Sequence, residues 1–409
     1  MRLLFISDVH PATPHISAVR LWTFACEMAK RGHQVVFVTR RTEAQKHAPK
    51  HTELRPLLEE QDWRQPLVLE LETPTVGPST SHSAWPLFRR IRTAWNFLVL
   101  GGPQWHWSRT VASHAARIVA DIRPELIWTT FGHTSNLMAA RVLARVGHCP
   151  WVLDIKDNWE LYVPRGLRAL MAWRTRGWAA ITTNAEFTRA MARKWQGQDA
   201  TVVYSGVDEA FLHSSVGSAG AVEDLSVNLI GGLYDRARLG AILEGLADWM
   251  AGLSQADRAR VRIRYLGGDT AVFSEVAAGV IEKSHLDVPG YVAIGEMARL
   301  CGLALANIYV RHEGTFHHKL LELLACGRPA AVFPSESPES WGLVKRTGGR
   351  LVEVSSRAAV CDALAGLMSE YRTSGIEHAP RDPAEFPYTW ANLAIGLEAA
   401  FASVNAGRE

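Results

Sequence analysis

The stretch that decides the fold is Glu313-Gly-Thr-Phe-His-His-Lys-Leu-Leu-Glu-Leu-Leu-Ala-Cys-Gly-Arg-Pro329. It follows a short apolar run at residues 304–310, which is typical of a buried strand. Leucine and alanine then recur at helical spacing, and Gly327 followed by Pro329 marks the end of a helix. We therefore predict a strand, a loop and a helix that begins near His317.

Such a helix start is suited to binding a phosphate. Its unpaired N–H groups and the positive end of its dipole favour an anion, and Lys319 adds a full positive charge. Glu322 lies one turn later on the same face, where its carboxylate can accept hydrogen bonds from ribose hydroxyls. The residues indicate a nucleotide site. The alternative interpretation is an ordinary amphipathic helix with a solvated Lys–Glu pair.

Composition limits the classes of protein that fit. The 409 residues are enough for two domains with separate cores. A net charge of +3, with no long block of lysine or arginine, argues against nucleic acid as the main partner. The five scattered cysteines form no Cys-x-x-Cys pair, which favours reduced thiols in a cytoplasmic protein over a disulfide frame or a zinc site. We expect no secretory signal, since the chain enters a strand at residues 2–6, and no apolar run is long enough to span a bilayer.

The first residues predict one βαβ unit. A strand at 2–6, a helix at 19–31 and a strand at 33–39 imply a parallel sheet. The loop at 7–20 is then at the carboxyl end of a strand, where ligands bind. Because it lacks the Gly-x-Gly-x-x-Gly phosphate loop, a dinucleotide oxidoreductase is disfavoured.

The alternation of strands and helices continues along the chain, apart from residues 42–72, which look polar and irregular. A Ser/Gly/Ala-rich stretch at 214–223 is typical of a hinge and separates two such sets. Further strands are expected at 125–130, 150–155, 179–183, 261–266, 288–292, 305–310 and 350–354, and a last helix at 389–404.

Asp154 and Asp157 follow the strand expected at 150–155. Two carboxylates at the carboxyl end of a strand resemble metal ligands, but Lys156 interrupts their spacing. An acceptor contact or a role in loop structure is favoured instead, and no metal site is expected.

Aromatic and apolar residues alternate with Arg89, Arg90 and Arg92 between Trp85 and Trp107. A basic, aromatic and amphipathic segment of this kind can lie in a membrane interface. The alternative is a helix that packs its aromatic face against the domain and leaves its arginines in water. On the first interpretation, segment 85–107 holds a cytoplasmic protein at the inner face of the membrane.

Several stretches resemble, in the same order, motifs of GT-B glycosyltransferases, most closely the retaining enzymes of family 4. Residues 30–35 look like the family's second strand, and 149–159 is similar to the "PWvaDfRDpW" stretch of exopolysaccharide-type members. Residues 204–208 resemble the "NGvD" turn between domains, and 229–238 the donor loop "GtlY…R". Residues 319–329 match "KlfEylacGrP".

The resemblance implies an α/β fold of two Rossmann-like βαβ domains that face each other across a cleft. The expected boundaries are 1–205 for an acceptor-side domain, 206–384 for a nucleotide-sugar domain, and 385–409 for a helix that packs back on the N-terminal domain.

The resemblance also implies a donor nucleotide-sugar held by the second domain. Lys319 and one of Arg236 or Arg238 would neutralise the diphosphate in place of a metal, and Glu322 would hold the ribose. Glu313 is near the acidic position that contacts the donor sugar, although its spacing from Glu322 is one residue longer than usual. Other expected donor contacts in the same loop are Gly314, Thr315, His317 and His318.

In the first domain, many relatives carry paired glycines between the first strand and the first helix, and this chain does not. His15 and Arg20 are expected to replace them or to contact the acceptor, together with Asp154 and Asp157. His133 is where retaining relatives place a residue that faces the sugar, so His133 and Glu313 are the candidate catalytic residues. No covalent nucleophile is required in the usual proposal for these enzymes.

The resemblance therefore implies a retaining, metal-independent glycosyltransferase of polysaccharide biosynthesis, with a glycan, a lipid-linked or a small-molecule acceptor. UDP is favoured over GDP on family frequency, and no cofactor beyond the donor is expected. Two alternatives stay open. One is a sugar-nucleotide epimerase of the same fold, and the other is a degenerate subunit that binds a nucleotide without turnover.

Overall fold

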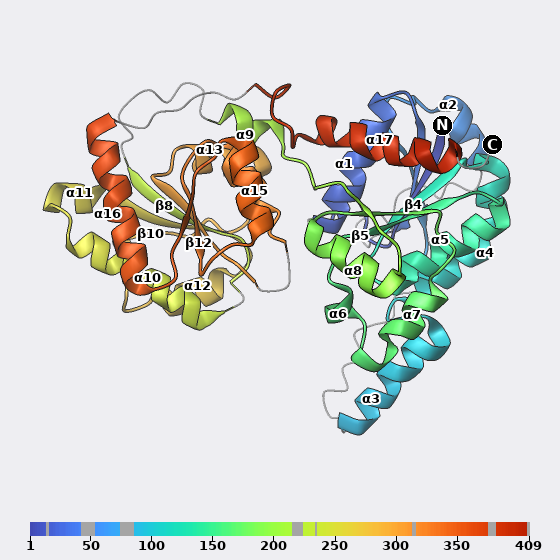
Figure 1. The fold of residues 1–409 in the computed structure, drawn as a ribbon, viewed down its shortest axis with the longest axis horizontal. Coiled ribbons are helices and arrows are strands. Elements are labelled where there is room, and N and C mark those ends of the chain that lie inside the picture. Colours follow the sequence, from blue (N-terminus) through green and yellow to red (C-terminus); the bar gives the residue numbers. More distant parts are fainter. Residues whose placement is uncertain are drawn as a thin grey trace. The chain divides into compact units, whose positions relative to one another are not determined.

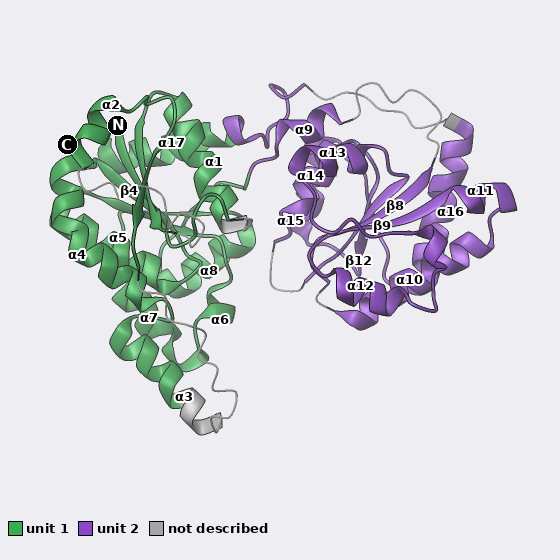
Figure 2. Cartoon of the chain, turned by 180° about the vertical axis from the view of Figure 1, so that it is seen from behind, with its two compact units in different colours: residues 1–205, 393–409 green, residues 206–392 purple. Residues whose placement is uncertain are grey.

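The computed structural model describes residues 1–13, 16–41, 54–73, 86–214, 224–233, 235–312, 316–374 and 382–406. The chain divides into two compact units (Figure 2). Unit 1 contains residues 1–205 and 393–409, and unit 2 contains residues 206–392. Each unit has its own sheet and its own apolar core.

Unit 1 is built on a seven-stranded parallel sheet in the order β3-β2-β1-β4-β5-β6-β7 (Figure 1). Its strands are β1 (Arg2–Ser7), β2 (Gln34–Arg40), β3 (Leu67–Leu71), β4 (Leu126–Thr130), β5 (Trp151–Ile155), β6 (Ala180–Thr183) and β7 (Thr201–Val202). Its helices are α1 (Ile16–Lys30), α2 (Leu54–Glu60), α3 (Pro86–Trp95), the π-helix η2 (Asn96–Leu100), α4 (Trp105–Ile122), α5 (Thr134–Gly147), α6 (Trp159–Tyr162), η3 (Arg165–Leu167), α7 (Arg168–Arg174), α8 (Glu186–Gln196) and most of α17 (Trp390–Ala406).

Unit 2 is built on a six-stranded parallel sheet in the order β10-β9-β8-β11-β12-β13. Its strands are β8 (Leu225–Ile230), β9 (Val261–Leu266), β10 (Leu286–Asp287), β11 (Ala306–Val310), β12 (Ala330–Phe333) and β13 (Leu351–Glu353). Its helices are α9 (Glu209–His213), α10 (Arg236–Ala251), α11 (Gln255–Arg260), α12 (Thr270–Ala277), η4 (Lys283–His285), α13 (Ile294–Gly302), α14 (Lys319–Ala325), α15 (Pro338–Thr347) and α16 (Arg357–Ser374).

The two sheets confirm the prediction of two Rossmann-like α/β domains. Their central strands are mostly apolar and are buried along their whole length, as expected when helices cover both faces of a parallel sheet. In each sheet the strand order reverses once, between β1 and β4 in unit 1 and between β8 and β11 in unit 2. Ligands of such sheets bind outside the carboxyl ends of the strands at that point.

Two predictions of secondary structure are wrong. Residues 42–72 were expected to be irregular, but they include α2 and the edge strand β3. Four of the five residues of β3 are apolar, and this short run was overlooked within a stretch that is otherwise mostly polar. No strand forms at 288–292, and β10 occupies Leu286–Asp287 instead. The chain then leaves the sheet because Pro289 has no N–H to donate and Gly290 has a φ of +77°.

Within the described ranges, we find no helix that combines the length and the apolar character needed to cross a membrane.

Candidate active site

The stretch from β11 to α14 forms the centre of the candidate donor site in unit 2. The leucines of α14 are buried against the unit. The helix ends at Ala325, with Cys326 as its C-cap residue, and Gly327 follows with a φ of +73°. The helix begins at Lys319, two residues later than predicted, and His318 is its N-cap residue without a side-chain capping bond. Glu313, Gly314 and Thr315 lie outside the described residues, so their roles stay predictions.

Lys319 and Glu322 form an ion pair across the first turn of α14. The distance from Lys319 Nζ to Glu322 Oε2 is 2.8 Å, and the exposed fractions of the two side chains are 31% and 7%. His318 Nε2 lies 3.3 Å from the other carboxylate oxygen of Glu322. The structure thus brings together three of the predicted donor residues.

Electrostatics keep both members of this pair charged. Burial alone would raise the pKa of the Glu322 carboxyl group, but Lys319 and His318 outweigh that effect and lower it to about 2. Burial opposes the charged form of Lys319, yet Glu322 raises the pKa of the ammonium group above its ordinary value. A fixed positive charge therefore lies beside a carboxylate that is a permanent hydrogen-bond acceptor at neutral pH.

We predict that Glu322→Gln lowers the free energy of unfolding at neutral pH by about 2 kcal/mol, because Lys319 loses its partner. The folded-state pKa is depressed, so the contribution of Glu322 is present above its ordinary pKa of 4.5 and is lost as the pH falls toward 2. Urea unfolding of wild type and variant at several pH values checks this. A difference that stays constant down to pH 3 would show that the pair is not responsible.

Of the two predicted arginines of α10, only Arg238 reaches the loop that follows β11. Its Nη1 donates to the carbonyl oxygen of Arg311 at 3.0 Å, directly after the end of β11. Arg236 instead forms an ion pair with Glu275 of α12 at 2.6 Å, and both side chains are more than half exposed. Arg238 is therefore the better placed partner for Lys319.

A second group at the carboxyl edge of unit 2 is not found by the sequence motifs. Tyr309 Oη donates to Glu336 Oε1 at 2.6 Å, and Arg311 Nε lies 3.4 Å from Glu336 Oε2. The Glu336 side chain is only 3% exposed, and its Oε2 also accepts hydrogen bonds from Ser337 N at 2.9 Å and Ser340 Oγ at 2.8 Å. Glu336 follows β12, the neighbour of β11, and that position at a strand end is the signal that could have found it.

His317 packs its ring against Tyr309, with 5.5 Å between ring centroids. Burial lowers the pKa of its imidazole to about 4, and its Nε2 accepts the backbone N–H of His312 at 3.2 Å. His317 is therefore a neutral group at physiological pH and orders the loop before α14.

Two of the predicted acceptor-side residues of unit 1 have a structural role. Arg20 and Asp154 are completely buried, and they bind each other through Nε to Oδ2 at 3.0 Å and Nη2 to Oδ1 at 2.8 Å. Thr130 and Thr182 donate to the same carboxylate. Because both side chains are completely buried, the structure contradicts the prediction that Arg20 and Asp154 contact an acceptor.

His133 and Asp157 remain at the carboxyl edge of unit 1, at the ends of the neighbouring strands β4 and β5. Both are half-buried, and the His133 ring lies 6.3 Å from the ring of Tyr162. A methyl group added at Gly132 would lie 3.8 Å from the Asp157 carboxylate, so the two loops are close. His15 lies outside the described residues.

The same edge carries a pair that sequence reasoning missed. His10 Nε2 lies 3.0 Å from Glu70 Oε1, and these residues come from the loop after β1 and from β3. Because β3 itself was not predicted, the sequence offered no reason to connect them. Among the described residues, no group of three or more His, Cys, Asp or Glu side chains is arranged to hold a metal ion.

The two doubly wound parallel sheets match the GT-B fold of solved glycosyltransferase structures. Residues 17–211 match the family model described as Glycosyltransferase Family 4. Comparison with curated protein sequences found no match. The family match and the fold together support a GT-B glycosyltransferase.

Three solved structures are similar over nearly the whole chain. Anabaena Alr3699/HepE in complex with UDP and glucose is 13% identical, with 98% of this chain and 100% of that chain covered and a TM-score of 0.62. Sucrose-phosphate synthase from Thermosynechococcus elongatus is 14% identical, with 99% and 96% covered and a TM-score of 0.59. UDP-GlcNAc 2-epimerase from Neisseria meningitidis, bound to UDP-GlcNAc, is 11% identical, with 98% and 100% covered and a TM-score of 0.57. At these identities the likeness is one of fold.

Proposed function

We propose that this chain is a retaining glycosyltransferase that transfers a sugar from a nucleotide-sugar, preferably a UDP-sugar, without a divalent metal. The observation that carries the proposal is the Lys319–Glu322 pair in unit 2, with Arg238 directed to the neighbouring strand end. Two cations there can stabilise the charge that grows on a leaving diphosphate, and the carboxylate can hold ribose hydroxyls. The UDP bound to the Anabaena neighbour supports the choice of base.

On this proposal unit 2 is the donor side and unit 1 the acceptor side. Asp157 is the described acceptor-side candidate of unit 1 that remains after the correction of Arg20 and Asp154, and His15, outside the described residues, stays a candidate as well. His133 stays a candidate catalytic residue. The acceptor is a glycan, a lipid-linked sugar or a small molecule. A glycan or lipid-linked acceptor would place the enzyme in polysaccharide biosynthesis.

The test is the reaction of purified protein with a panel of UDP- and GDP-sugars in the presence of EDTA. We expect release of UDP and, when an acceptor is supplied, a product with the anomeric configuration of the donor by NMR. A product of opposite configuration, or a strict need for metal, would contradict the proposal.

A sugar-nucleotide 2-epimerase is the second candidate, because the Neisseria epimerase shares the fold over the whole chain. An epimerase would convert UDP-GlcNAc to its C2 epimer. The same NMR assay separates the two candidates, since a transferase releases UDP and leaves the remaining donor unchanged at C2.

We further propose that segment 85–107 contacts the inner face of a membrane. Figure 1 shows α3 at an extremity of unit 1, and Ile91, Trp95, Leu98 and Val99 of α3 and η2 are all between 45% and 59% exposed. Phe97 and the more distant Trp107 are buried in the core. Packing against the domain therefore applies to these two residues, and contact with a membrane applies to the exposed ones. An exposed apolar group of this kind, in a segment that also carries three arginines, suits an anionic interface.

We predict that Trp95→Ser combined with Val99→Ser reduces sedimentation with anionic vesicles at least several-fold, because the interface loses its exposed apolar anchors. The matched control is Ile294→Ser with Ile395→Ser, two exposed apolar residues in other parts of the chain. Equal sedimentation of the two variants would argue against docking through this segment, as would unchanged binding after Arg89, Arg90 and Arg92 are replaced by Glu.

A further inference from the structure

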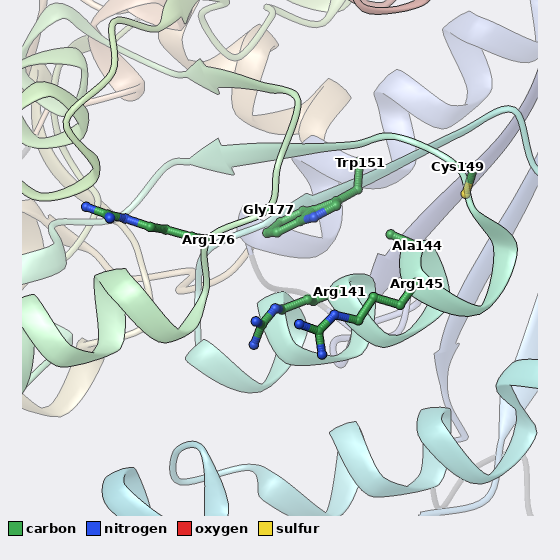
Figure 3. Close-up of a pocket in the computed structure, with 7 residues that line it drawn as sticks. All are labelled: Arg141, Ala144, Arg145, Cys149, Trp151, Arg176 and Gly177. Atoms are coloured by element: carbon green, nitrogen blue, oxygen red, sulfur yellow. The ribbon is translucent and has the colours of Figure 1, made fainter. Parts of the chain in front are cut away.

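A pocket of about 380 Å³ lies in unit 1, away from the residues considered so far (Figure 3). Arg141 and Arg145 line it from the last turns of α5, Trp151 from the first position of β5, and Arg176 with Gly177 from the loop before β6. It is therefore at the amino ends of β5 and β6, whereas His133 and Asp157 are at the carboxyl ends. No step proposed above uses this pocket.

The three arginines of the pocket give it an uncompensated positive charge. Within the described part of the chain, no carboxylate forms an ion pair with Arg141, Arg145 or Arg176. Arg141 Nη1 donates to the carbonyl oxygen of Arg174 at 2.7 Å, which fixes its guanidinium group. Burial, followed by repulsion from Arg145 and Arg174, lowers the pKa of Arg141. Figure 3 shows Arg141 and Arg145 beside each other and Arg176 extending away from them, so the like charges that an anion in the pocket would compensate are chiefly those of Arg141 and Arg145.

A neutral donor also faces the pocket. Trp151 is only 1% exposed, and its indole Nε1 donates to no other described residue. A methyl group added at Gly177, which lines the pocket, would lie 3.9 Å from that nitrogen, so the N–H is on the pocket side. The nitrogen is not one of the buried polar atoms without a partner, so it is open to the pocket, where an oxygen atom of a ligand can accept its hydrogen bond.

We propose that this pocket binds a phosphate group. The neighbouring guanidinium groups of Arg141 and Arg145 and one indole N–H can donate to the several oxygens of a phosphate, and Arg recognises phosphate through paired hydrogen bonds. Arg176 adds positive charge from the loop before β6. The volume is larger than a bare phosphate needs, which leaves room for the group to which the phosphate is attached.

The surroundings favour a lipid headgroup over free phosphate as the source. Arg174, whose carbonyl holds Arg141, donates through Nη1 to the carbonyl oxygens of Phe97, at 2.9 Å, and Leu98. This bond ties α7 to the π-helix η2, next to exposed Leu98 and Trp173. A phosphate bound in the pocket would thus lie near apolar side chains that suit the interface of an anionic membrane. The site does not depend on transferase activity.

The experiment compares the full-length wild type with Arg145→Gln/Arg176→Gln. Both are exposed pocket residues whose side chains form no ion pair within the described ranges. The matched control is Arg64→Gln/Arg117→Gln, which removes the same charge from exposed positions of unit 1. One measurement is the thermal midpoint in sodium phosphate against sodium chloride at equal ionic strength. The other is sedimentation with phosphatidylglycerol vesicles against phosphatidylcholine vesicles.

We expect phosphate to raise the thermal midpoint of the wild type and of the control. In the pocket variant, the phosphate concentration that gives half of the full shift should be at least about tenfold higher. Preferential loss of sedimentation with phosphatidylglycerol in the pocket variant identifies a lipid headgroup as the source. A phosphate effect without vesicle binding identifies free phosphate. Equal phosphate shifts in all three proteins, or none in the wild type, would overturn the proposal. The effect of UDP on the midpoint should persist in the pocket variant, so failure here is distinct from failure of the donor site.

Discussion

Replacing Lys319 with alanine is expected to weaken the binding of a UDP-sugar by about 100-fold and to lower its turnover at least as much. Lys319 carries a full charge, held in place by Glu322 at 2.8 Å, and preorganised charges of this kind are worth about two orders of magnitude in related chemistry. Isothermal titration with UDP, together with assays of UDP release, measures both effects.

The control for this prediction is Arg236→Ala, which removes the same charge from the same unit. Because Arg236 is exposed and bound to Glu275, we expect less than about a threefold change in affinity. Removing Lys319 also leaves Glu322 buried without its main partner, so Lys319→Ala/Glu322→Gln should be measured as well. Affinity of Lys319→Ala close to that of the wild type would show that the diphosphate binds elsewhere.

Asp154→Asn is expected to lower the free energy of unfolding by about 3 kcal/mol, the second largest effect that the structure predicts. Asp154 is the only acidic partner found for Arg20 among the described residues, and both side chains are completely buried. Arg20 also donates to Ser205 Oγ at 3.2 Å and to the carbonyl oxygen of Val203 at 2.9 Å. Loss of the carboxylate would leave a guanidinium charge in the core without compensation.

Urea unfolding measures this effect, and Asp199→Asn is the control. Asp199 forms ion pairs with Arg189 and Arg193, but these pairs are in contact with solvent. Ion pairs at the surface contribute little to the free energy of unfolding. A similar loss of stability in both variants would contradict the structural role given to Arg20 and Asp154.

The sequence predicted the fold well because buried parallel strands are mostly apolar and lie between helical patterns. The strand expected at 261–266 coincides with β9, and the one expected at 305–310 differs from β11 by one residue. Edge strands were harder, since β3 is a short apolar run within a mostly polar stretch and β10 is only two residues long. Their position is set by pairing with β2 and β9, which no local pattern reveals.

The candidate site was predictable where its members are close in sequence. Lys319 and Glu322 share one helical turn, so spacing alone placed them together. Arg20 and Asp154 are 134 residues apart, and each looked like a ligand contact because its partner could not be known. Glu336 and the pocket arginines were missed for the same reason, because their neighbours come from other segments of the chain.

If unit 2 receives a sugar-bearing diphosphate, the side chains of Lys319 and Arg238 bind it. A crystal structure of the protein with UDP tests this binding. We expect the diphosphate within hydrogen-bonding distance of Lys319 Nζ and the ribose hydroxyls on Glu322. Strong UDP binding with Lys319 directed away from the diphosphate, or with UDP bound outside unit 2, would contradict it.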